Sequence, residues 1–146
     1  MMGKSHLADI PDNSFQKVFT CASVASDADG IVGSQAFVAP GNLKIKRAWY
    51  IPWTDQATIG TATTSATYRR INLLNGSTGG VGTVIMASCD ITASVASKAS
   101  KAFSTTANNT AAASEILYFS ALTVGGDDND GSILRAGVLQ VEYELL

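Results

Sequence analysis

The chain has 146 residues and a formal net charge of −2, with 46% hydrophobic residues and only 15% charged ones. Ordinary globular domains carry about 25% charged residues, so we expect a neutral surface, rich in small side chains, that is suited to burial against neighbouring subunits. This length predicts a single domain with a real core. The acidic balance argues against nucleic-acid binding, and no apolar run reaches the roughly 18 residues of a membrane span.

The N-terminal stretch, residues 1–13, is predicted to be an extended arm that precedes a sandwich domain of residues 14–146. It is polar, shows no sustained hydrophobic period and has no apolar core followed by a cleavage site, which argues against a secretion signal. Because nothing in it can form a core, we expect it to contact a partner. Its candidate contact residues are Lys4, His6, Leu7 and Ile10.

Two strands are predicted before the first proline-glycine pair of the chain. The first begins near Phe15 and runs toward Val24, and a turn follows over residues 26–30. The second is short, from Ser34 to Ala39, and stops at Pro40-Gly41.

The clearest internal strand covers residues 43–53, where apolar side chains occupy most odd positions. This alternation places Trp49 and Trp53 in the core and leaves Tyr50 on the other face, together with Lys44 and Lys46, which are expected on a solvated face or in salt bridges. Arg47 interrupts the apolar face, which indicates either a β-bulge or an inward charge held in a salt bridge.

Four further strands are predicted over residues 68–74, 81–91, 115–123 and 137–146. The Asn-Gly start and the glycines of 75–80 favour a hairpin. Residues 93–113 leave two alternatives open, a short helix or a strand followed by a loop. The last strand alternates strictly and is expected inside a sheet, since free ends fray.

About eight strands with turn residues between them favour one antiparallel two-sheet β-sandwich of jelly-roll or Greek-key type. No alternating strand and helix pattern appears, so a parallel sheet is not expected. The predicted fold class is all-β.

Few residues offer reactive chemistry, and we expect no enzyme activity and no cofactor. His6 is the single histidine, so a Ser/His/Asp or Cys/His set would need the arm. Cys21 and Cys89 are expected to be buried and reduced, with a disulfide as the alternative. The acidic loop 125–131 is a weak calcium candidate, although its spacing does not fit the helix-flanked calcium loop. Its candidate ligands are Asp127, Asp128 and Asp130.

Several motifs follow one another in a familiar order: Trp49-Tyr50-Ile51-Pro52, residues 68–75, a Gly-rich turn into residues 84–88, Leu117-Tyr118-Phe119 and residues 136–143. Over residues 45–146 this order resembles small virion proteins of tailed bacteriophages, the head decoration (cement) proteins and related head-fibre modules.

The resemblance implies a jelly-roll-like sandwich, commonly a homotrimer, on the outside of a phage capsid, where it bridges and stabilises major capsid subunits. It would be made in the host bacterial cytoplasm and would bind neither nucleic acid nor membrane. The alternative hypothesis is a carbohydrate-binding module, free or at a fibre tip, in which Tyr50 and Tyr68 are the more accessible stacking residues.

Overall fold

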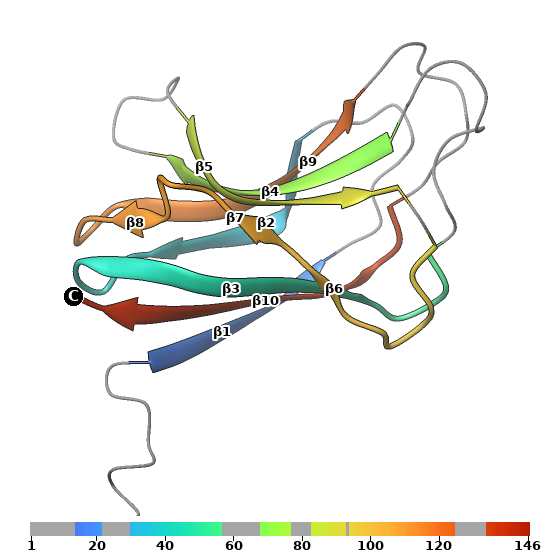
Figure 1. Cartoon of the computed structure of the whole chain (residues 1–146), viewed down its shortest axis with the longest axis horizontal. Helices are drawn as coiled ribbons and strands as arrows, with labels where there is room; N and C mark the ends of the chain where they lie inside the picture. Colours follow the sequence, from blue (N-terminus) through green and yellow to red (C-terminus); the bar gives the residue numbers. More distant parts are fainter. Residues whose placement is uncertain (1–13, 22–29, 57–67, 77–82, 93, 125–133) are drawn as a thin grey trace, which may run out of the picture.

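The computed structural model describes residues 14–21, 30–56, 68–76, 83–92, 94–124 and 134–146 (Figure 1). These residues form ten strands and no helix. The strands are β1 (Ser14–Cys21), β2 (Gly30–Val38), β3 (Leu43–Pro52), β4 (Tyr68–Gly76), β5 (Thr83–Ile91), β6 (Lys101–Ala102), β7 (Ser104–Thr105), β8 (Thr110–Ala111), β9 (Ile116–Val124) and β10 (Gly137–Leu145).

The strands form two antiparallel sheets that pack face to face (Figure 1). The first sheet has the order β1-β10-β3-β6, with β8 also on β3, and the second has the order β2-β9-β4-β5-β7. With β6 to β8 taken as one broken strand, this is jelly-roll topology: the first, eighth, third and sixth strands form one sheet, and the second, seventh, fourth and fifth the other. The all-β sandwich predicted from the sequence is confirmed.

The last strand, β10, lies between β1 and β3 as expected of a strand inside a sheet. Two boundaries differ from the sequence prediction. β2 begins at Gly30, which was expected in a turn, and its register with β9 shifts between Ile31 and Ala36. β4 runs on through Asn75 and Gly76, so the predicted Asn-Gly turn starts as strand, although β4 and β5 pair antiparallel as a hairpin requires.

Residues 101–111 run along one side of the sandwich and bind both sheets in turn, as the amber segment in Figure 1 shows. β6 pairs with β3, β7 pairs with β5, and β8 returns to β3. Backbone hydrogen bonds continue this pattern. The Phe103 amide donates to the Ala48 carbonyl oxygen of β3 (2.9 Å), and the Thr106 amide donates to the Met86 carbonyl oxygen of β5 (2.9 Å). The segment therefore closes this side of the sandwich. Neither alternative left open for 93–113 anticipated a strand that changes sheets.

The core lies between the sheets and is built from aliphatic side chains around a row of aromatic rings. Phe19 of β1 stacks on Phe37 of β2 at 5.6 Å between ring centroids and meets Phe119 of β9 edge-on at 5.8 Å. Phe103 of the closing segment also contacts Phe119 edge-on, at 5.8 Å. Each such pair contributes about 0.5–1.5 kcal/mol beyond its buried area, so the rings join both sheets and the closing segment.

Candidate functional site

A β-bulge in β3 determines which side chains reach the outer face of the first sheet. Ile45 pairs with Tyr143 and Arg47 pairs with Glu142, so Lys46 is the additional residue. Of the two explanations predicted for Arg47, the bulge is confirmed. Lys46 and Arg47 both face outward, and the alternation of buried and exposed residues inverts after them.

The inversion overturns the placement of three aromatic side chains. Tyr50 is fully buried, and its hydroxyl donates to the Arg135 carbonyl oxygen (2.7 Å). Trp53 is 53% exposed and Trp49 is half-buried. The prediction that both tryptophans lie in the core was wrong, because unbroken alternation assigns every residue after a bulge to the wrong face.

Apolar residues of three strands come together on this outer face. Ile51 of β3 pairs with Val138 of β10, and Trp49 lies beside Gln140, which pairs with Val18 of β1. Val18 is 62% exposed. We call the surface formed by five of these side chains the aromatic face; it comprises Val18, Trp49, Ile51, Trp53 and Val138.

Backbone contacts fix the position of Trp53 at the end of β3. Its amide donates to the Ala136 carbonyl oxygen (3.0 Å), and its own carbonyl accepts from the Ser97 hydroxyl (2.7 Å). The Ser97 amide in turn donates to the Asp55 carboxylate (2.7 Å). Hydrogen bonds therefore fix the backbone that carries the exposed indole.

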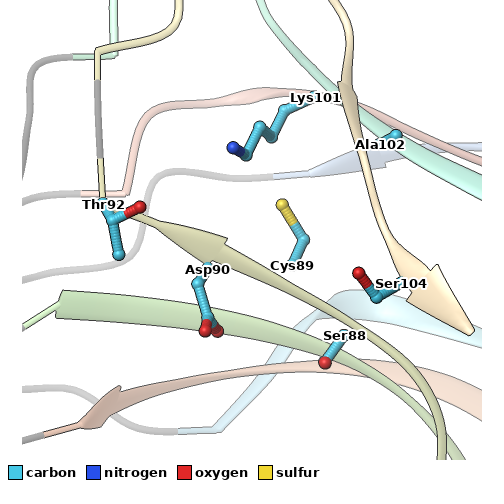
Figure 2. A pocket seen from close by; sticks show the side chains of 7 residues that line it. All are labelled: Ser88, Cys89, Asp90, Thr92, Lys101, Ala102 and Ser104. Atoms are coloured by element: carbon cyan, nitrogen blue, oxygen red, sulfur yellow. The ribbon is translucent and has the colours of Figure 1, made fainter. Parts of the chain in front are cut away.

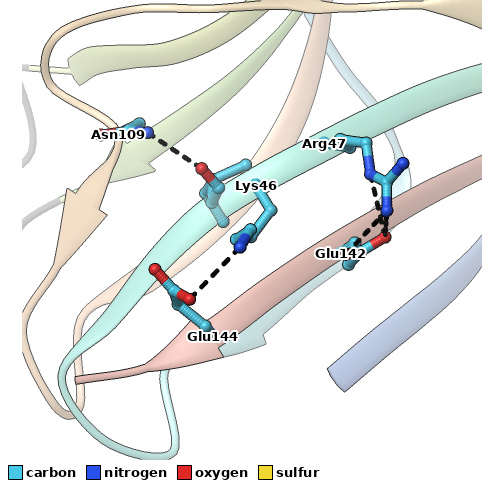
Figure 3. A network of polar contacts seen from close by, with 6 residues as sticks. Lys46, Arg47, Asn109, Glu142 and Glu144 are labelled. Atoms are coloured by element: carbon cyan, nitrogen blue, oxygen red, sulfur yellow. Dashed lines mark hydrogen bonds and ion pairs between the residues drawn. The ribbon is translucent and has the colours of Figure 1, made fainter. Parts of the chain in front are cut away.

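A row of ion pairs, drawn in Figure 3, borders the aromatic face on the side of Arg47. The Arg47 guanidinium donates to both carboxylate oxygens of Glu142 (3.2 Å each) and lies 5.5 Å from the ring centre of Trp49. Lys46 Nζ donates to Glu144 (3.4 Å). Lys46 thus lies in a salt bridge, one of the two settings predicted for it, and the salt bridge of Arg47 lies on the outer face rather than inward.

Within these pairs the cations are exposed and the carboxylates are covered. The Arg47 side chain is 65% exposed and that of Glu142 only 11%, while Lys46 is 42% exposed and Glu144 28%. This border therefore presents positive charge to the solvent.

The outer face of the second sheet holds Tyr68 and the paired basic residues of β4. Arg70 binds Asp90 through Nε (2.6 Å) and Nη2 (3.0 Å), and it also donates to the Tyr68 hydroxyl (3.1 Å). Tyr68, expected to be accessible, is half-buried and held by this contact. The side chain of the adjacent Arg69 is fully buried.

A shallow polar pocket of about 200 Å³ opens between β5 and β6 (Figure 2). Cys89 lies at its floor beside Lys101, and burial raises the pKa of the Cys89 thiol to about 12. Cys89 is a free, buried thiol, as expected for a small core residue. It stays protonated at neutral pH and is a poor nucleophile. The pocket is lined by Ser88, Cys89, Asp90, Thr92, Lys101, Ala102 and Ser104.

The remaining predicted site residues lie outside the described residues. These are the arm contacts Lys4, His6, Leu7 and Ile10 and the calcium candidates Asp127, Asp128 and Asp130. Among the residues that the structure describes, no three metal-ligating side chains come together. In the same part of the chain no helix is long and apolar enough to cross a membrane.

No model of a known protein family matches this sequence, and none of the curated proteins compared with it does. A chain of the T13 particle of infectious bursal disease virus is 15% identical with a TM-score of 0.37, and the match covers 92% of this chain and 36% of that one. A chain of the same virus, Gx strain, is 14% identical with a TM-score of 0.28, over 92% and 37% of the two chains. This chain thus spans little more than a third of the viral chains, and we derive no function from a likeness at this level.

Proposed function

We propose that this chain is a non-enzymatic structural protein of a virus particle, and specifically a decoration protein on the outside of a phage capsid. The observation that carries the proposal is the aromatic face, where a jelly-roll sandwich leaves Val18 and Trp53 more than half exposed. Large side chains at such exposure on a flat sheet surface favour a second protein that covers them. The low content of charged residues, 15%, supports the same conclusion.

The polar groups of the described residues support a structural role rather than catalysis. Glu142 and Asp90 are each bound by an arginine, and Glu115 accepts bonds from the Asn75 side chain (2.6 Å) and the Ala112 amide (2.8 Å). General acid–base catalysis needs a group whose proton is available near neutral pH, whereas these carboxylates are engaged in holding strands together.

In this proposal the protein is a homo-oligomer, with a trimer expected, that bridges subunits of the major capsid protein. The arm of residues 1–13, through Lys4, His6, Leu7 and Ile10, adds contacts outside its own sandwich. Apolar surface contributes about 25 cal/mol per Å² on burial, part of which is lost to ordering. Even a modest contact, repeated over many copies, therefore raises the free energy needed to open a shell.

The test is co-sedimentation of the purified protein with particles of the encoding virus that lack it, followed by electron microscopy. We expect saturable binding to the outer surface, and particles that withstand heating better when it is bound. A variant without residues 1–13 should keep its thermal unfolding temperature and bind more weakly. Binding that is undetectable for the full chain contradicts the proposal, and unchanged binding of the shortened chain contradicts the role of the arm.

Glycan binding is a second candidate function, favoured by the exposure of Trp53, four residues after the half-buried Trp49. Flat aromatic rings stack on sugar rings. In this hypothesis the sugar-binding residues are the two tryptophans instead of Tyr50 and Tyr68, which the sequence had suggested. Because these are the only two tryptophans of the chain, intrinsic fluorescence reports directly on this surface. A panel of neutral and acidic glycans that leaves the emission unchanged at millimolar concentration dismisses this candidate.

A further inference from the structure

We infer that the aromatic face is the docking surface for a different protein, whose contacting surface is apolar at its centre and acidic along one side. The inference rests on the proposed function, since it names the surface by which the chain would attach to a shell. It differs from the role of the arm, because it concerns residues of the folded sandwich.

The apolar part of the surface has the composition of a protein interface. Its members are aliphatic as well as aromatic, with Val18, Ile51 and Val138 on the same face as the tryptophans and an arginine at the border. Tryptophan and arginine are enriched at the centres of protein interfaces and carry much of their binding energy. The exposed Val18 and the partly exposed Ile51 add area for another protein but offer no stacking surface to a sugar.

The shape of the surface also favours a protein. Small ligands and sugars usually bind in concave sites. The aromatic face is instead an outer sheet surface to which β1, β10 and β3 all contribute.

Charge determines which kind of protein fits. Lys44, Lys46 and Arg47 are exposed along one border of the face, whereas Glu142 and Glu144 lie largely covered beneath them. The border is thus locally positive on a chain whose net charge is −2. A partner with carboxylates along this border would complement it, speed association and fix the orientation of docking.

The same asymmetry disfavours a second copy of this chain as the occupant. Two aromatic faces packed about a two-fold axis would bring Lys46 and Arg47 of one copy against the cations or the apolar side chains of the other. Burying charges against such surfaces without a carboxylate partner is costly. The occupant is therefore not a second aromatic face, and a contact with another face of a second copy is the outcome that the mass of the isolated oligomer tests.

The experiment compares a matched pair of exposed valines on the two edge strands. Val18 on β1 is 62% exposed and Val38 on β2 is 59% exposed, but Val38 lies on the opposite sheet. Val18→Glu should weaken co-sedimentation with particles of the encoding virus at least about tenfold, because it places an unpaired charge in the apolar part of the contact. Val38→Glu should change it less than about twofold, and thermal unfolding should show that both variants fold.

Two further measurements test the acidic character of the partner. Val18→Lys should weaken binding less than Val18→Glu, because only the glutamate also repels carboxylates. Wild-type binding should fall as salt rises from 0.05 to 0.3 M, and a Lys44→Gln/Lys46→Gln variant should bind more weakly with a smaller salt dependence.

The outcomes separate this inference from the proposed function. If the wild-type protein does not bind the particles, the proposed function and this inference are both contradicted. If it binds and Val18→Glu binds equally well, only the inference is overturned. It is likewise overturned if binding ignores salt, if glycans compete for the tryptophans, or if Val18→Glu lowers the mass of the isolated oligomer, which would make the face an interface between copies.

Discussion

Two arginine sites with the same local chemistry lie on opposite outer faces of the sandwich, and they differ in what surrounds them. On the aromatic face, Arg47 binds Glu142 of the neighbouring strand through two nitrogens and lies over Trp49, two residues along its own strand. The cation is exposed and the carboxylate is covered.

On the second sheet, Arg70 binds Asp90 of the neighbouring strand and lies 5.6 Å from the ring centre of Tyr68, again two residues away. Here the two charged side chains are almost equally exposed, 30% and 36%. The next outward residue of β4, Asn72, is buried between Ser88 and Ser120 on the flanking strands. The described neighbours of Arg70 toward Asn72 are therefore polar, whereas on β9 Arg70 pairs with Leu122.

The comparison teaches that the pairing motif alone does not identify a functional surface. Both sites hold two strands together, and a cross-strand ion pair of this kind contributes only about 0.2–1 kcal/mol. Among the side chains that the structure describes, exposed apolar ones border the first site, and the bulge at Lys46 is what turns those of β3 outward. The predictions below test that difference, beginning with the bulge.

The largest effect is expected from deleting Ala48, directly after the bulge. The chain must then either turn Tyr50 outward or place Arg47 in the buried position of Ala48. The first outcome exposes a core side chain, and the second buries a charge. We expect a loss of about 3–5 kcal/mol or more in the free energy of unfolding, measured by urea denaturation.

Deleting Lys46 is the matched control, because it removes the additional residue and leaves Ile45 inward, Arg47 outward and Tyr50 inward. We expect a loss below about 1 kcal/mol and unchanged tryptophan emission. If the two deletions cost the same, the bulge does not set the orientation of the aromatic face.

The next effect is expected at Gly137, where β10 passes closest to β3 below the aromatic face. A methyl group there would overlap the Ile51 carbonyl oxygen and lie 2.8 Å from the Pro52 Cα. Because both are backbone atoms, the strands must separate, and Gly137→Ala should cost about 1–3 kcal/mol. At Gly41 the nearest atom to such a methyl group is a Leu145 side-chain carbon at 3.6 Å, so Gly41→Ala should cost little. Equal unfolding temperatures for the two variants would contradict the close approach.

A pH-dependent effect is expected from Cys89, which lies in the core beneath the second face. Burial raises its pKa from 9.0 to about 12. Between these pH values the unfolded chain loses a proton that the folded chain keeps, so the stabilisation present below pH 9 is lost as pH rises. From pH 8 to pH 10 the free energy of unfolding should fall by about 1.4 kcal/mol more in the wild type than in Cys89→Ala.

Thiol labelling checks the same prediction directly. In a Cys21→Ser background, Cys89 should react with a disulfide reagent only after denaturant is added. Rapid labelling of the native protein at pH 8, or equal pH dependence in wild type and Cys89→Ala, would mean that the thiol is not buried.

Much of the fold could be predicted from the sequence because most strands bury one face and so alternate. The last strand is the best case: Leu139, Val141 and Tyr143 are buried, as the pattern requires. The closing segment could not be predicted, since its strands are two residues long and bind both sheets, so no period builds up.

The candidate site was missed for one identifiable reason. The sequence indicates a bulge at Arg47, but an alternation that continues unchanged past it predicts Trp49 and Trp53 on the core face. The adjacent charges at 46 and 47 were the usable signal, because two consecutive outward residues require every later side chain to change face. Arg69 carries no comparable signal, since nothing local distinguishes it from Arg70.

The smallest effect compares the two arginine sites themselves. Arg47→Ala leaves Glu142, which is 11% exposed, without its two donors, and should cost about 1 kcal/mol. Arg70→Ala leaves Asp90 well hydrated and should cost about 0.5 kcal/mol or less, a difference that screening at 0.5 M salt removes. Only Arg47→Ala should also shift the tryptophan emission, because both tryptophans lie on the aromatic face. An emission shift in Arg70→Ala, or equal losses of stability, would mean that the two faces are not distinct environments.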